Sequence, residues 1–176
     1  MNPSNQATTA TVEAHPAQTG PRLDARDALG RVLDLIRGCR GVEDIDAARL
    51  REVFGVEFHE HAGRLGFGER VSREWWTAFE WDPAHPYGPR FEFSFRPDLP
   101  GSHPDAGDIC AIDAEAFAAE LAAMGFAREI RRAEHGRPIR EDFERPGMTV
   151  EVYTRGEADA PPEKISHACV QRVCIL

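Results

Sequence analysis

The chain has almost no lysine, few cysteines and no long hydrophobic run. Lys164 is the one lysine among 21 basic residues, and four cysteines are scattered over 176 positions. No segment approaches the roughly 18 consecutive apolar residues that a membrane-spanning helix needs. Residues 1–22 lack the basic start and apolar stretch of a secretory signal. The lack of a membrane span and of a secretory signal predicts a cytoplasmic protein without a membrane partner.

Catalytic motifs are equally scarce. Ser94 lies in Phe-Ser-Phe, and the glycines of residues 63–68 match neither the dinucleotide-binding nor the phosphate-binding loop. The cysteines show no catalytic spacing, and Cys169 and Cys174 are an odd number of residues apart, so they leave opposite faces of a straight strand. We expect free, buried thiols, no cofactor and no enzyme active site.

The acidic balance limits the class of partner. Thirty acidic residues against 21 basic ones give a formal charge of −9. Such a surface repels nucleic acid and favours basic partners, although solubility alone also explains it.

One phrase, Ile-Asp-Ala, occurs at residues 45–47 and again at 112–114. Each copy opens an apolar-periodic run that stops at a glycine, Gly55 or Gly125, and a β-rich stretch follows. The aspartate suits a helix N-cap and the glycine suits a helix end. The sequence therefore predicts a helix-then-strands unit used twice, over residues 45–96 and 112–175.

The remaining patterns predict the fold class. Residues 1–22 have no apolar period and predict a disordered tail before a single domain at 23–176. A first helix is expected after Asp24. Strand signals follow in groups, with Phe91, Phe93 and Phe95 on one buried face. Because strands do not alternate with helices one to one, we expect an α+β protein with a mainly antiparallel sheet and helices packed on one face.

Two charged patterns have more than one interpretation. Glu57, His59 and His61 share one face of a strand, and two imidazoles with a carboxylate suit zinc or ferrous iron. A solvated strand face explains them better, so we predict no metal there and keep a metal-dependent enzyme as an alternative. Residues 128–140 hold five arginines, which suit either an acidic ligand or a charged outer strand that resists aggregation.

The helix-to-strand joints at residues 53–56 and 121–126, with the acidic loops at 98–108 and 157–163, give the chain a family resemblance. It resembles bacterial immunity proteins of polymorphic or type VI secreted toxins. The resemblance implies a non-catalytic protein that binds and neutralises a cognate toxin, with a basic toxin domain as partner. A small-ligand-binding regulatory module is a further alternative.

Recognition residues are expected on the loops and on one tryptophan. Trp75 and Trp76 leave opposite faces of one strand, so one of them can anchor a partner. The predicted partner-binding residues are Trp76, Asp82, Tyr87, Asp98, Asp105 and Asp108.

Overall fold

In the computed structural model, which describes residues 21–136, 138–156 and 167–176, each of three α-helices begins at an aspartate cap. The helices are α1 (Ala25–Gly38), α2 (Ala47–Phe54) and α3 (Ala114–Ala123), capped by Asp24, Asp46 and Asp113. Each carboxylate accepts a hydrogen bond from the backbone amide three residues later, which satisfies a donor that the first turn leaves open. Gly55 ends α2 with a φ of 66°, a left-handed conformation that suits glycine. The predicted caps are confirmed.

The strands form one eight-stranded sheet in which every neighbouring pair is antiparallel. They are β1 (His59–His61), β2 (Arg64–Arg70), β3 (Trp75–Asp82), β4 (Arg90–Pro97), β5 (Ala127–Arg132), β6 (Pro138–Arg145), β7 (Met148–Gly156) and β8 (Ala168–Ile175). Their order across the sheet is β1-β2-β3-β4-β8-β7-β6-β5. The predicted α+β fold with a mainly antiparallel sheet is confirmed. Val56 and Phe58 are buried in the core before pairing begins at His59, so β1 has only three residues.

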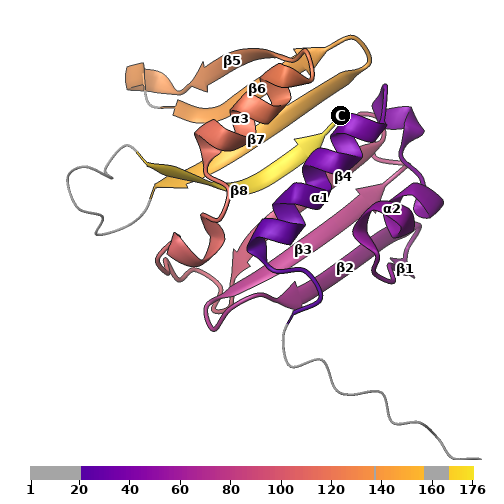
Figure 1. The fold of residues 1–176 in the computed structure, drawn as a ribbon, viewed down its shortest axis with the longest axis horizontal. Coiled ribbons are helices and arrows are strands. Elements are labelled where there is room, and N and C mark those ends of the chain that lie inside the picture. The colour runs from indigo at the N-terminus through magenta and orange to yellow at the C-terminus, as the bar shows by residue number, and fades with distance from the viewer. Residues whose placement is uncertain (1–20, 137, 157–166) are drawn as a thin grey trace, which may run out of the picture.

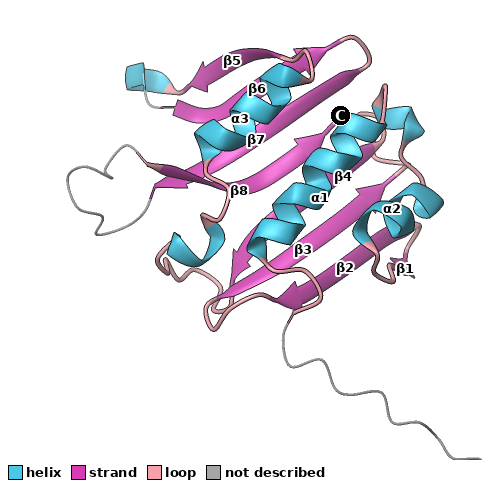
Figure 2. Ribbon diagram, in the orientation of Figure 1, coloured by secondary structure: helices cyan, strands magenta, loops and turns pink. Residues whose placement is uncertain are grey.

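The helices lie on one face of the sheet (Figures 1 and 2). Figure 1 shows α1 along the middle of the sheet, α2 over the side of β1 and β2, and α3 over the side of β5 to β7. None of the helices in the described part of the chain has the length and apolarity that a bilayer crossing requires. Because the helices of the described residues all lie on one face, the opposite face of the sheet is left open.

The same order of elements occurs in both halves of the chain. α2 precedes the meander β1 to β4, and α3 precedes the meander β5 to β8. The last strand of each half lies at the centre of the sheet, where β4 pairs with β8. A superposition of residues 45–96 on 112–175 that matches the helix and at least three strands stays a prediction.

The core lies between the sheet and the helices. Phe91, Phe93 and Phe95 are at most 1% exposed, so the predicted phenylalanine face is confirmed. Trp75 is fully buried on the same side of the sheet, whereas Trp76 points to the open face and is 38% exposed. Phe54 of α2 packs on this aromatic layer. Strand alternation thus separates an apolar side from a polar side.

Parts of two predicted segments lie outside the described residues. Residues 1–20 of the predicted tail and the acidic loop at 157–163 are among them. Arg22, at the end of that tail, is held against β2, because its backbone amide donates to Glu69 and its guanidinium lies over the Phe67 ring.

Replacing Phe93 with alanine tests the position of the core. Its ring centroid lies 5.2 Å from that of Phe79 and 4.8 Å from that of Phe95, so truncation leaves a cavity. We expect Phe93→Ala to lower the free energy of unfolding in urea by about 3–5 kcal/mol. Tyr87→Ala is the control, because Tyr87 is 95% exposed and should change stability by less than about 0.5 kcal/mol. Equal stability of the two variants would contradict this core.

Candidate functional site

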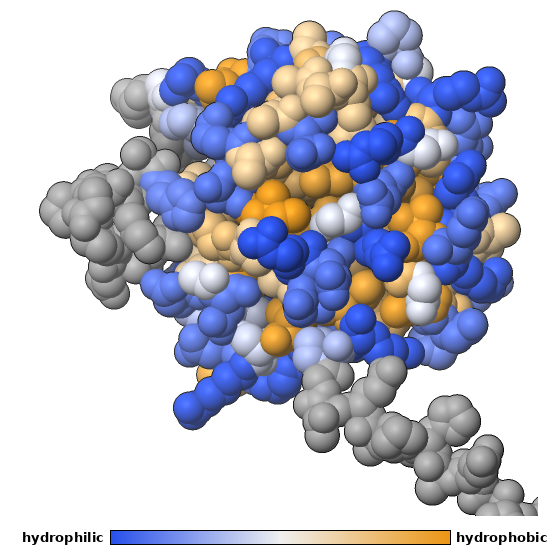
Figure 3. Space-filling model, viewed as in Figure 1, coloured by the Kyte–Doolittle hydropathy of each residue, from blue (hydrophilic) through white to orange (hydrophobic). Residues whose placement is uncertain are grey.

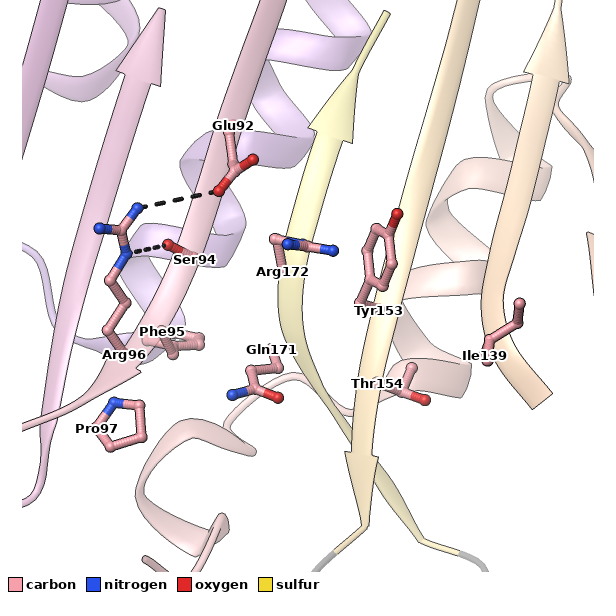
Figure 4. Close-up of a pocket in the computed structure, with 10 residues that line it drawn as sticks. All are labelled: Glu92, Ser94, Phe95, Arg96, Pro97, Ile139, Tyr153, Thr154, Gln171 and Arg172. Carbon is pink, nitrogen blue, oxygen red and sulfur yellow. Dashed lines mark hydrogen bonds and ion pairs between the residues drawn. The ribbon is translucent and has the colours of Figure 1, made fainter. Parts of the chain in front are cut away.

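The open face of the sheet carries mainly polar side chains. Figure 4 views part of it, with the helices behind the strands and the side chains of β4, β8 and β7 in front. Figure 3 shows the opposite, helix-bearing face, where apolar surface lies between hydrophilic side chains.

Carboxylates line up across this open face in one transverse row. Residues that lie directly opposite each other on successive strands are Glu80, Glu92, Cys174, Glu151, Asp142 and Glu129. We call these six residues the acidic row. Like charges that face each other across strands are destabilising unless cations compensate them.

Arginines next to the acidic row supply that compensation. The ion pairs are Arg64–Glu80 at 3.5 Å, Arg90–Glu92 at 3.3 Å, Arg140–Glu151 at 2.9 Å, Arg140–Asp142 at 2.8 Å, Arg131–Asp142 at 2.6 Å and Arg131–Glu129 at 2.8 Å. The acidic row is thus neutralised by the chain's own side chains. Ion pairs between arginines and carboxylates therefore extend across the open face of the sheet.

Asp142 is the most buried carboxylate of the acidic row, at 3% exposure. Burial alone raises the pKa of a carboxyl group, but hydrogen bonds from Arg131 and Arg140 outweigh it and hold the pKa of Asp142 below its usual value. The ionised form is therefore favoured more strongly in the folded chain than in the unfolded one.

The thiol of Cys174, in the acidic row, is unreactive. Burial, with the negative charge of Glu92 beside it, raises the pKa of Cys174 to about 11. Arg90 donates a hydrogen bond to its sulfur at 3.1 Å. Cys174 is therefore a protonated thiol at neutral pH, and not the thiolate that nucleophilic catalysis needs.

A shallow depression of about 480 Å³ opens beside the acidic row (Figure 4). The guanidinium of Arg172 stacks on the Tyr153 ring at 3.8 Å, and its Nε is buried without a hydrogen-bond partner in the described part of the chain. Arg96 lines the depression on the side of β4, with its Nε donating to Ser94. Guanidinium groups bind carboxylates through parallel hydrogen bonds, so this depression suits an anionic or carbonyl oxygen. Sequence reasoning missed it, because it depends on the register of three strands.

A second depression, of about 670 Å³, is lined by Arg70, Asp98 and Leu99 among others, and the first two of these contact Trp76. The Trp76 Nε1 donates to Asp98 Oδ1 at 2.7 Å, and Arg70 lies over the indole ring at 5.4 Å while pairing with Asp98. The two depressions meet at the end of β4, because Arg96 and Pro97 line the first and Asp98 lines the second. The structure thus brings Trp76 and Asp98 together, as two of the predicted partner-binding residues.

The other predicted partner-binding residues lie in two separate places. Asp105 and Asp108 are exposed on the linker after β4, where the Asp105 carboxylate accepts a hydrogen bond from the Gly107 amide. Asp82 and Tyr87 lie at the end of β3 that is opposite to Trp76. Asp82 is about 20 Å from Trp76 along the strand. Asp82 is only 7% exposed and pairs with Arg64, whereas Tyr87 is fully in solvent. One compact contact surface cannot be centred on both ends at once.

The ligand atoms of Glu57, His59 and His61 do not converge. Within the described residues, the one group of three that could hold a metal consists of Cys110, His167 and Cys169 instead. His59 and His61 are exposed on the short edge strand β1. The geometry therefore gives no support to the metal alternative at residues 57–61.

The prediction of free thiols is wrong for two of the four cysteines. Cys110 and Cys169 form a disulfide across 59 residues of sequence, while Cys39 and Cys174 are free and buried. The linker after β4 turns back onto β8, where Asp113 makes a β-bridge with Cys169, and this turn brings the two sulfurs together. The spacing of the cysteines does not indicate such a contact, although a His-x-Cys pattern ends at Cys169.

No protein-family model, curated protein or solved structure matches the chain. Its function therefore has to be inferred from its own surface and side chains.

The pH dependence of stability tests the ion pairs of the acidic row. Because the pKa of Asp142 is lowered on folding, its contribution is present above the unfolded pKa of about 3.9 and is lost as pH falls through the lower folded value. We expect Asp142→Asn to cost about 1–3 kcal/mol at pH 7, measured by urea unfolding, and to flatten the stability profile below about pH 4. Glu129→Gln is the control, because its exposed side chain should contribute less than about 1 kcal/mol. A profile that keeps its full acid dependence in Asp142→Asn would reject this account.

Proposed function

We propose that the chain is a non-catalytic binding protein. It holds a protein partner on the open face of its sheet, around the C-terminal end of β4. The observation that carries the proposal is Trp76, a partly exposed tryptophan on that face whose neighbours Arg96 and Asp98 line the two depressions. Tryptophan and arginine are the residues most often found to dominate binding energy at protein interfaces. Trp76, Arg96 and Arg172 place both types within one stretch of the surface.

The Trp76 side chain is held in place before any partner arrives. Its indole nitrogen is bonded to Asp98 and its ring is covered by Arg70. A side chain that is already ordered loses less conformational entropy on binding, so more of its contact energy contributes to affinity. The Arg172 depression beside it offers a donor for a carbonyl or carboxylate of the partner.

The charge distribution favours a basic partner. The net charge is −9, yet the carboxylates of the acidic row are compensated locally. Exposed carboxylates outside the acidic row, including Asp105 and Asp108 on the adjacent linker, are left to attract a cationic protein. Charge complementarity of this kind accelerates association.

A basic toxin domain is the partner that we propose, and the chain would act as its immunity protein. The resemblance of the helix-to-strand joints to such proteins supports this. In this role the open face would cover the toxin's active surface and prevent turnover.

Truncation of Trp76 tests the contact surface. We expect Trp76→Ala to weaken binding to the product of the neighbouring gene by roughly 30-fold or more, because hot-spot truncations cost about 2 kcal/mol or more. Binding would be measured by calorimetry, with far-UV circular dichroism to verify folding. Tyr87→Ala is the matched aromatic control and should change affinity less than about 5-fold. If Tyr87→Ala has the larger effect, the partner binds at the Asp82 end instead.

Charge reversal tests the electrostatic account separately. We expect Asp105→Lys with Asp108→Lys to slow association more than it speeds dissociation, and raised salt to slow the wild type in the same way. Glu52→Lys with Glu57→Lys changes the net charge equally at other exposed positions and should slow association less. Asp105→Asn removes charge while keeping an acceptor for the Gly107 amide. Association rates that ignore both salt and position would leave an apolar interface as the remaining explanation.

A further inference from the structure

Two cysteines and a histidine from distant parts of the chain meet where β8 begins. The ligand atoms of Cys110, His167 and Cys169 all lie within 4.8 Å of one another. The Sγ of Cys110 is 3.9 Å from Nδ1 of His167. Two sulfurs and one imidazole nitrogen are a donor set that zinc prefers, and catalytic zinc sites use three protein ligands of these types.

The histidine is oriented for metal binding by a carboxylate. Its Nε2 lies 3.1 Å from Asp113 Oδ2, which directs Nδ1 toward the sulfurs. Asp113 is itself fixed, because its other oxygen accepts the Ala116 amide as the N-cap of α3. A carboxylate behind a ligating histidine is the usual outer shell of a zinc site.

We propose that the reduced chain binds one zinc ion through Cys110, Cys169 and His167, with Asp113 supporting the histidine. Zn–S bonds of about 2.3 Å and Zn–N bonds of about 2.0–2.1 Å place tetrahedral ligand atoms roughly 3.5–3.8 Å apart. The 3.9 Å between Cys110 Sγ and His167 Nδ1 is close to that spacing. Reduction lets the two sulfurs separate to a similar distance, and water completes the tetrahedron.

Disulfide and zinc exclude each other at this site. A dithiol reductant transfers two electrons and two protons to the S–S bond, giving two thiols and becoming a disulfide itself. Zinc then displaces the two thiol protons, so two Zn–S bonds form and two protons are released. An oxidising compartment would favour the disulfide and a reducing one the zinc-bound dithiolate. In both states the linker after β4 stays attached to β8.

Metal binding by the full chain tests this site. The protein is reduced with a water-soluble phosphine, desalted under nitrogen, and titrated with zinc against a chromophoric chelator. We expect one zinc per reduced chain and none per oxidised chain. Cobalt in place of zinc should give a sulfur-to-cobalt charge-transfer band and the strong visible bands of a tetrahedral site, which report the ligands directly.

Variants assign the ligands. Cys110→Ser and His167→Gln should each weaken zinc binding at least 100-fold. Asp113→Asn should weaken it about 10–100-fold while still capping α3, since asparagine caps as well as aspartate. The controls Cys39→Ser with Cys174→Ser, and His59→Ala with His61→Ala, should bind as the wild type does. Circular dichroism verifies that each variant is folded.

Several results would overturn the proposal. A reduced wild type that binds no stoichiometric metal, or a folded Cys110→Ser or His167→Gln chain with unchanged affinity, would leave a structural disulfide only. Loss of binding in the His59 and His61 variant would move the metal to β1. None of these readouts uses the protein partner, so they stand apart from the proposed function.

Discussion

The pairing of β4 with β8 is the constraint on which the remaining structure depends. It joins the two meanders through a ladder in which Phe93 lies opposite Val173 and Glu92 lies opposite Cys174. The first pair is buried beneath the helices, and the second belongs to the polar face. A slip of one residue would exchange these roles along both strands, because side chains alternate with a period of two. Burial of the aromatic layer therefore also sets the order of groups on the open face.

The acidic row follows from this register. Carboxylates that are far apart in sequence become direct neighbours because the five strand pairings that join them coincide at one level of the sheet. Each has arginine partners within the same face or, for Glu151 and Asp142, shares Arg140. The charges that could steer a partner are consequently those outside the row. The polar face thus has an ion-paired row of carboxylates, and beside that row lies Arg172, whose buried Nε has no hydrogen-bond partner among the described residues.

The elements could be predicted from sequence and the sites mostly could not. Asp24, Asp46 and Asp113 cap helices through hydrogen bonds to amides three residues later. Such local contacts can be predicted from a single sequence. Strand alternation likewise assigned the phenylalanine face and separated the two adjacent tryptophans. The acidic row, the Arg172 depression and the Cys110–Cys169 bond depend on which strands are neighbours and in which register. Nothing in the spacing of 59 residues between the bonded cysteines encodes that proximity.

The two outermost strands limit how the protein can associate with itself. β1 offers only three residues for pairing, and β5 carries Arg128, Arg131 and Arg132, with Arg128 bonded to Glu115 and Glu141. Residues 128–132 thus behave as the charged outer strand considered for this arginine-rich segment. A short edge and a charged edge both oppose the addition of a strand from another chain. Pairing of a second copy along either edge is therefore disfavoured, which directs contacts to the face and loops of the sheet.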